Sequence, residues 1–316
     1  MNRFHFHWTN TSAAIGRISA RFSYRHGLAL GVTALVVIWT YGATLRGMAA
    51  RWENDQHYSH GYLVPLFAIV LLVLRRSYLE TTDWQPSWWG LGFLLLAAAL
   101  RAGDAFYYVE WFDCLSLLPA LAGLAVLLGG WGVLRWCWPA IAFLFFMIPL
   151  PFFLDNALAY PLRLIATQSS TYVLQTLGLP AVADGTDIFL NDSTSIQVAP
   201  ACSGLGMLIT FFALSAAVTL LFQRPWTDNA VILLSAAPIA IMANVVRITA
   251  TALLYEWSAA DWAREVLHNW TGRLLMMPVA LLLLLLELLV LERLLVPTQP
   301  QRSVRLHFSR GGSHES

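Results

Sequence analysis

Three side chains of this sequence have the reactivity that covalent acyl chemistry requires. Cys202 stands in the segment Pro200–Gly204, Arg247 lies inside a long apolar run, and His268 precedes another apolar run. A thiolate can attack a carbonyl carbon, an imidazole can transfer the proton, and a fixed cation can stabilise the developing oxyanion. The three residues therefore predict a catalytic set, provided that the fold brings them together.

Each residue also has a plain structural interpretation. Free cysteines are often buried apolar side chains, and a histidine at an interface is usually solvated. However, Cys202 opens a predicted helix, whose N-terminus favours the thiolate over the thiol. An arginine at membrane depth usually faces a bundle interior or a wet cavity, and Asn244 shares a helical face with Arg247. We therefore expect Asn244, Ser203 and Gly204 to contact a substrate.

The composition indicates that a lipid bilayer surrounds much of the chain. Of the 316 residues, 58% are hydrophobic and only 12% are charged, and the mean hydropathy is +0.61. Soluble domains usually carry about 25% charged residues, so a soluble enzyme is disfavoured. A net charge of +1 excludes a broad basic face for nucleic acid. The three cysteines lie far apart, so we expect neither a metal site nor a cofactor.

Apolar runs along the chain predict an all-α integral membrane protein, a polytopic bundle of about eight transmembrane helices. Each run approaches the roughly 20 residues that are needed to cross a membrane. The runs are Leu28–Arg46, Gly61–Leu74, Trp88–Ala105, Leu115–Leu134, Trp136–Phe153, Ser203–Phe222, Ala230–Tyr255 and Leu274–Leu295. They predict a transmembrane domain over 27–296, between a cytoplasmic tail over 1–26 and a polar cytoplasmic tail over 297–316.

Arginine placement predicts the orientation. All 19 basic residues are arginine, and most of them fall on one side if the N-terminus is cytoplasmic. Both termini then lie inside, and Cys202, Arg247 and His268 lie at the outer face. Asp155–Gly178 is interpreted as an amphipathic or partly inserted helix at that face. If it crossed the membrane fully, the number of crossings would become odd instead of even. The runs Ile188–Leu190 and Ser195–Val198 predict a small outer-face hairpin.

Several motifs together resemble the exosortase/archaeosortase family of membrane transpeptidases. They are the Pro-Ala-Cys-Ser-Gly element at 200–204, the Asn-Val-Val-Arg run at 244–247, and His268 with Gly272 four residues on. The segment Tyr58–Pro65 is similar to the N-terminal signature of the family. The resemblance runs from about Trp52 to Leu295. His268 matches the bacterial form, because archaeal relatives have an arginine in that place.

The resemblance implies a cysteine protease or transpeptidase of the bacterial inner membrane, with Cys202, Arg247 and His268 as its catalytic residues. The implied partners are exported proteins with a PEP-CTERM-type sorting signal: a Pro-Glu-Pro motif, a transmembrane helix and a basic end. Tyr58 and His60 would then shape or bind the substrate. Two alternatives remain open: a transporter that binds an anion through Arg247, and a noncatalytic component of envelope or exopolysaccharide assembly.

Overall fold

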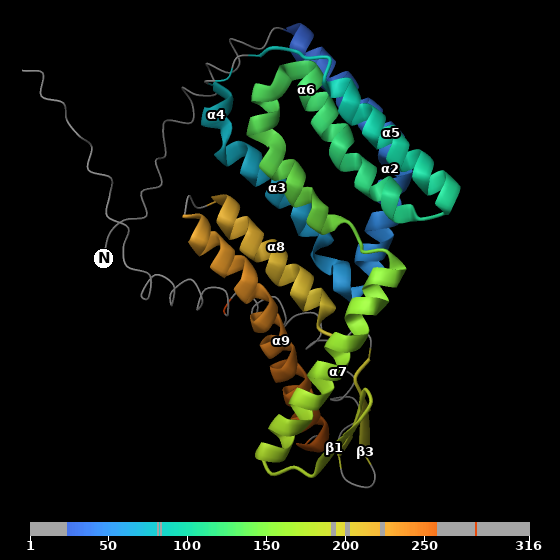
Figure 1. The fold of residues 1–316 in the computed structure, drawn as a ribbon, viewed down its shortest axis with the longest axis vertical. Coiled ribbons are helices and arrows are strands. Elements are labelled where there is room, and N and C mark those ends of the chain that lie inside the picture. Colours follow the sequence, from blue (N-terminus) through green and yellow to red (C-terminus); the bar gives the residue numbers. More distant parts are fainter. Residues whose placement is uncertain are drawn as a thin grey trace, which may run out of the picture.

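The computed structural model describes residues 24–80, 82, 84–190, 194–199, 203–221, 225–257 and 282. Helices dominate, and one small sheet follows α7 (Figure 1). The elements are α2 (Tyr24–Asn54), η1 (Gln56–Tyr62), α3 (Leu63–Leu74), α4 (Arg76–Glu80), α5 (Gly90–Tyr107), α6 (Glu110–Phe143), η2 (Leu144–Met147), α7 (Phe152–Thr176), β1 (Ala181–Asp184), β2 (Asp187–Leu190), β3 (Thr194–Gln197), α8 (Leu205–Leu221) and α9 (Trp226–Trp257).

Five helical segments within the described residues are long and apolar enough to cross a membrane, which supports a helical membrane protein. They are Gly31–Asn54, His57–Leu74, Gly90–Tyr107, Glu110–Met147 and Trp226–Leu254. The count differs from the eight predicted spans for three reasons. The fourth and fifth predicted spans fall within the single segment Glu110–Met147, which changes direction at Gly130, the sixth is the shorter helix α8, and Leu274–Leu295 lies outside the described residues except for Leu282.

Gly130 makes α6 change direction, as Figure 1 shows. Its backbone has φ +79° and ψ −172°, a conformation that side chains with a Cβ rarely adopt. A Cβ at this position would also collide with the carbonyl oxygen of Gln85. The boundary that was predicted between Leu134 and Trp136 is therefore wrong. The apolar run ends at Arg135, whereas the break in the helix lies at Gly130, against the backbone of Gln85.

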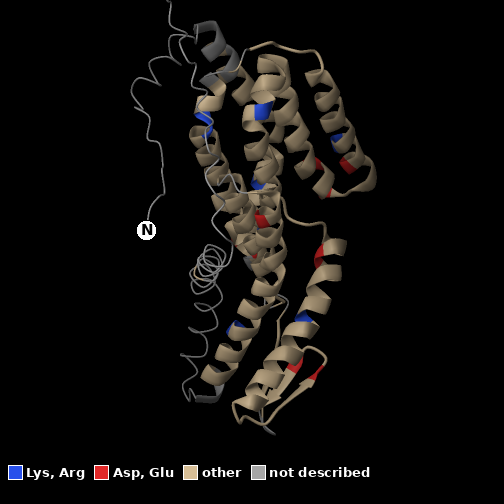
Figure 2. Ribbon diagram, turned by 60° about the vertical axis from the view of Figure 1, so that its left-hand side comes forward, with Lys and Arg blue, Asp and Glu red and all other residues tan. Residues whose placement is uncertain are grey.

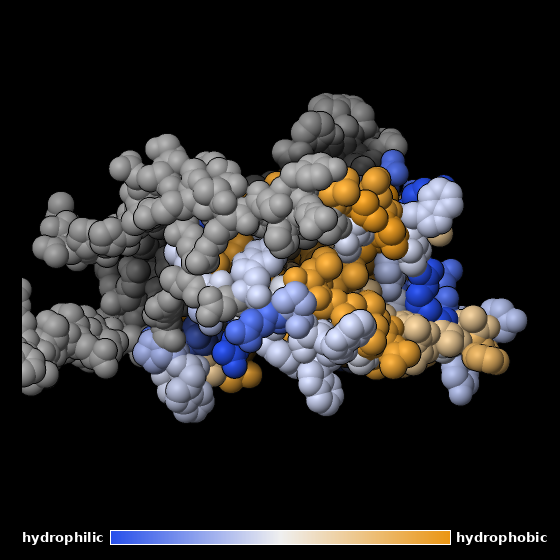
Figure 3. Space-filling view, turned by 90° about the horizontal axis from the view of Figure 1, so that it is seen from above, coloured by the Kyte–Doolittle hydropathy of each residue, from blue (hydrophilic) through white to orange (hydrophobic). Residues whose placement is uncertain are grey.

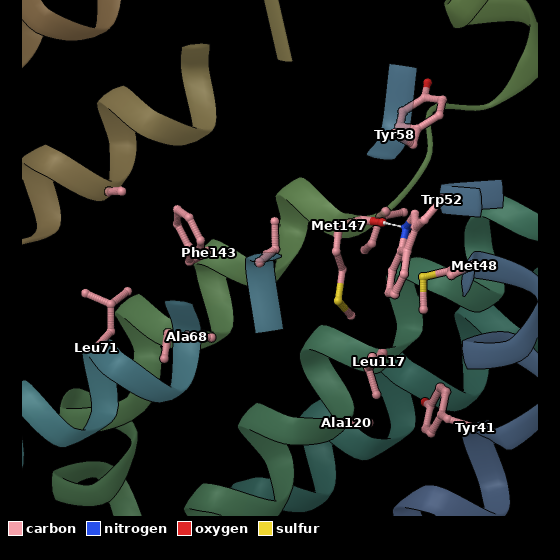
Figure 4. Close-up of a cluster of buried hydrophobic side chains, with 14 of the residues drawn as sticks. Tyr41, Met48, Trp52, Tyr58, Ala68, Leu71, Leu117, Ala120, Phe143 and Met147 are labelled. Carbon is pink, nitrogen blue, oxygen red and sulfur yellow. Dashed lines mark hydrogen bonds between the residues drawn. The ribbon is translucent and has the colours of Figure 1, made fainter. Parts of the chain in front are cut away.

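The largest buried cluster joins α2, η1, α3, α5 and α6 (Figure 4). At one end of this cluster, the Trp52 indole N–H donates to the Met147 carbonyl at 2.8 Å. Gly61 lies directly against the same indole ring, and a Cβ there would overlap it. The small residue thus allows η1 to pack closely on α2, and this contact positions the beginning of the Tyr58–Pro65 segment.

A polar network inside the bundle links α2, α5 and α6. Arg101 forms an ion pair with Asp113, with 2.8 Å between Nε and one carboxylate oxygen, and the Thr44 hydroxyl donates to the other oxygen. Tyr41 and Ser116 share a hydrogen bond of 3.0 Å nearby. Charged groups in a membrane bundle are costly unless they are paired, so the network accounts for Arg101 and Asp113 without a functional role.

Large apolar side chains cover the outside of the bundle. On α2 and α5 they include Trp39, which is 90% exposed, and Leu95, which is 70% exposed. The view from the end of the molecule also shows apolar side chains at the surface between polar ones (Figure 3). A water-soluble monomer rarely exposes apolar patches of this extent, whereas lipid chains would cover them.

The second part of the fold consists of α7, α8, α9 and the sheet. Aromatic and aliphatic side chains join α8 to α9 around Phe211, and a separate cluster around Ile188 and Ile248 joins α7, the sheet and α9.

Acidic residues lie in the sheet and near the turn between α5 and α6 (Figure 2). Asp155–Gly178, predicted as an interfacial segment, lies almost entirely in the 25-residue helix α7, which is not among the spanning candidates.

The sheet has three antiparallel strands in the order β1–β2–β3. The two runs predicted as a hairpin are paired as β2 and β3, with Ile188 opposite Ile196. The additional strand β1 pairs with β2 through a tight turn at Gly185, whose φ is +58°. The sequence Ala181–Asp184 has weak strand character, and β1 is held by its contacts with α7 and β2.

Candidate active site

The turn that leads into α8 is built from Ser203 and Gly204. The Ser203 hydroxyl accepts a hydrogen bond from the Leu205 N–H at 3.3 Å, and Ser203 is only 1% exposed. Gly204 has φ +86°, and its carbonyl accepts the Leu208 N–H at 2.9 Å. Cys202 directly precedes this turn in the chain. Cys202 and His268 themselves lie outside the described residues.

Gly204 packs directly on Asn244 of α9. A Cβ added to Gly204 would lie 2.8 Å from Asn244 Nδ2, and Asn244 is 1% exposed. Arg247 follows three residues later, and therefore lies on the same side of α9, about one turn further along. The structure thus brings Gly204, in the turn before α8, against Asn244 of α9, which lies one helical turn from Arg247.

Helix α7 packs against the same stretch of α9. Ser170, which is fully buried, donates to the Val245 carbonyl at 3.4 Å, between Asn244 and Arg247 in the chain. Arg247 is half-buried, and its carbonyl accepts a hydrogen bond from Thr251. A fixed cation beside a buried amide, in surroundings of low dielectric constant, can stabilise an oxyanion or bind an anionic group.

Tyr58 and His60 are buried in η1, and the polar atoms of both side chains bind protein groups. The Tyr58 hydroxyl donates to Asp155 at 2.8 Å and accepts from the Leu150 N–H at 3.1 Å. The two ring nitrogens of His60 lie 3.3 Å from the Thr210 hydroxyl and 3.1 Å from the Phe146 carbonyl. These contacts hold η1 against α7 and α8.

His57 was not singled out from the sequence, yet it lies against the first turn of α8. A Cβ at Gly206 would lie 2.8 Å from the His57 Cα, and the His57 side chain is buried. Asp55 caps η1 by accepting the His57 N–H at 3.0 Å, and its carboxylate lies 3.9 Å from His57 Nδ1. The Asp-x-His spacing before Tyr58 is the signal in the sequence that could have indicated this pair.

No group of three histidine, cysteine or acidic side chains within the described ranges could hold a metal ion. The described part of the site contains a half-buried arginine, a buried amide, a hydroxyl and a glycine turn. Such groups can orient a peptide carbonyl and stabilise negative charge on its oxygen. A nucleophile would have to come from a residue next to the turn, and Cys202 is the adjacent reactive side chain in the sequence.

Replacing Gly204 with alanine is expected to destabilise the protein more than the same change at Gly178. Both glycines have nearly the same φ, +86° and +87°, so each replacement costs about 1–2 kcal/mol of backbone strain. Only Gly204 has Asn244 at 2.8 Å, whereas a Cβ at Gly178 meets nothing within 4 Å. Overpacking adds about 1–3 kcal/mol. Thermal unfolding in detergent would measure the difference, and equal losses would contradict the close approach.

A protein-family model described as transmembrane exosortase matches residues 52–286, which is more than half of the chain. The matched range includes η1, the turn before α8, and the part of α9 that carries Asn244 and Arg247. No curated protein and no solved structure matched.

Proposed function

This chain belongs to the transmembrane exosortase family, and on that premise we propose that it is a cysteine transpeptidase or protease with Cys202 as its nucleophile. Its substrates would be exported proteins that carry a C-terminal sorting signal with a Pro-Glu-Pro motif, a transmembrane helix and a basic end. Family membership supports a membrane transpeptidase role in general, and the residues near the α8 turn support the specific assignment.

The single observation that carries the proposal is the contact between Gly204 and Asn244. Gly204 is two residues after Cys202, and Asn244 is three residues before Arg247. Because one turn of helix separates Asn244 from Arg247, this contact joins the segment that bears the thiol to the helix face that bears the cation. A nucleophile and an oxyanion-stabilising charge are then within reach of one peptide carbonyl.

In the proposed reaction the Cys202 thiolate attacks the carbonyl carbon of the scissile peptide bond. The carbonyl oxygen becomes an oxyanion, which the Arg247 guanidinium stabilises. When the tetrahedral intermediate collapses, a thioester to Cys202 forms and the carbon–nitrogen bond breaks, while His268 donates the proton that the leaving amine requires. An acceptor amine or water then attacks the thioester, loses a proton to His268 and releases the Cys202 thiolate.

The length of α9 supports a site at the outer membrane surface. The helix has 32 residues, so it is about 48 Å long and exceeds the roughly 30 Å hydrocarbon core. If α9 enters the core at its first residue, about 20 residues bring it to the opposite surface, near Val246. Arg247 would then lie at that surface. We propose that this is the outer face of a bacterial inner membrane, with both termini in the cytoplasm.

Co-expression with an exported reporter protein tests the proposal. The reporter carries the complete sorting tail, and cleavage is followed by its change in mass and by its release from the membrane. Wild-type protein is expected to cleave the tail, and a reporter that retains the transmembrane helix but lacks the Pro-Glu-Pro segment should stay intact. If the tail stays intact although the protein is present in the membrane, the proposed substrate class is wrong.

A further inference from the structure

Arg163 lies in the middle of the buried face of α7. The buried residues of this helix are Ala159, Ala166, Thr167, Ser170, Thr171 and Leu174. Arg163 follows the first of these by four residues and precedes the next two by three and four, so it belongs to the same stripe. Its Nε is buried and forms no hydrogen bond, while the residue as a whole is half-buried. The guanidinium therefore reaches from the helix face toward accessible space.

The positive charge of Arg163 is not neutralised within the described part of the chain. Arg101 has a carboxylate partner in Asp113, whereas no carboxylate within the described residues pairs with Arg163. The Arg163 guanidinium lies 5.8 Å from the ring centre of Tyr160, a weak cation–π contact. A partly buried guanidinium without a carboxylate can gain free energy by binding an anion.

The stripe that contains Arg163 faces the proposed catalytic site. Helix α7 contacts both α8 and α9. Ser170 belongs to this stripe, and its hydroxyl donates to the Val245 carbonyl of α9. Arg163 precedes Ser170 by seven residues, or about 10 Å along the helix axis. The same distance corresponds to about three residues of extended peptide. Figure 1 shows α7 and α9 crossing in this region.

We propose that Arg163 binds a carboxylate side chain of the substrate, about three residues from the scissile bond. Arg163 is thus a specificity-determining residue, separate from the catalytic set. The inference rests on the proposed function, and the glutamate of the Pro-Glu-Pro segment is the carboxylate that it would bind. A guanidinium recognises a carboxylate through two parallel hydrogen bonds, which fixes the position of the peptide as well as its charge.

The test exchanges charges on both partners. The cleavage rates of reporter tails with glutamate or glutamine at this position are measured for wild-type protein, Arg163→Gln and Arg163→Lys. Wild type is expected to cleave the glutamate tail about tenfold or more faster than the glutamine tail, because a hydrogen bond to a charged group is lost. Arg163→Gln should cleave both tails at similar, low rates, and Arg163→Lys should restore part of the preference because lysine retains the charge.

A charge reversal extends the test. Arg163→Glu is expected to prefer a tail with lysine in place of glutamate. Arg135→Gln, a change of an exposed arginine on α6, is the matched control and should retain the wild-type preference. Equal cleavage of the two tails by wild type, or an unchanged preference in Arg163→Gln, would overturn the role of Arg163. Failure of wild type to cleave any tail would instead overturn the proposed function, so the two failures are distinguishable.

Discussion

Replacing Cys202 with alanine is expected to abolish cleavage of the sorting tail, with a loss on the order of a thousandfold or more. No other group can form the thioester, because the other two cysteines, Cys114 and Cys137, lie in the membrane helix α6. The rate of tail cleavage in membranes from cells that express each variant would measure the loss. Cys202→Ser should also be severely impaired, since an alcohol is far less easily deprotonated than a thiol.

Matched controls for Cys202 come from the same chain. Cys114→Ala and Cys137→Ala each remove a thiol from α6 and should leave cleavage close to the wild-type rate. A covalent intermediate gives a second measurement: wild-type protein should form a substrate adduct that hydroxylamine releases, and Cys202→Ala should form none. If well-folded Cys202→Ala cleaved the tail normally, the nucleophile would have to be another residue, or the protein would be a noncatalytic component.

Replacing Arg247 with alanine is expected to lower cleavage by about a hundredfold to a thousandfold, the range seen when a group that stabilises an oxyanion is removed. In the proposed site the charge acts beside the buried amide of Asn244, where water screens it weakly. Arg247→Lys should recover only part of the rate, because lysine keeps the charge but lacks the planar pair of donors. Rates under single-turnover conditions would separate this effect from product release.

Met242 provides the control for Arg247. It lies on the same helix, five residues earlier, and is 65% exposed, so Met242→Ala should leave the cleavage rate unchanged. Thermal unfolding of all variants in detergent would show whether α9 keeps its packing. A transporter that binds an anion through Arg247 would behave differently: Arg247→Ala would abolish transport, while Cys202→Ala would be tolerated. That pair of results would contradict the enzyme assignment.

A helical membrane protein and the positions of most of its helices could be predicted from the amino-acid sequence alone. Apolar runs such as the one in Gly90–Tyr107 are local properties, and their length and composition alone make the bilayer the favourable solvent. The motif around 202–204 and the Asn-Val-Val-Arg run at 244–247 were equally visible. Each motif could be assigned a chemistry from residue type, and the family match covers both of them.

The way in which these local segments pack together was not visible in the sequence and is known from the three-dimensional structure. Three features depend on atoms that are distant in the sequence: the reversal at Gly130, the packing of Gly204 on Asn244, and the position of His57 against the first turn of α8. The burial pattern of α7 likewise showed that Arg163 lies on the helix face that packs inward. Side-chain periodicity defines the faces of a helix, but the face that is buried depends on packing against other elements.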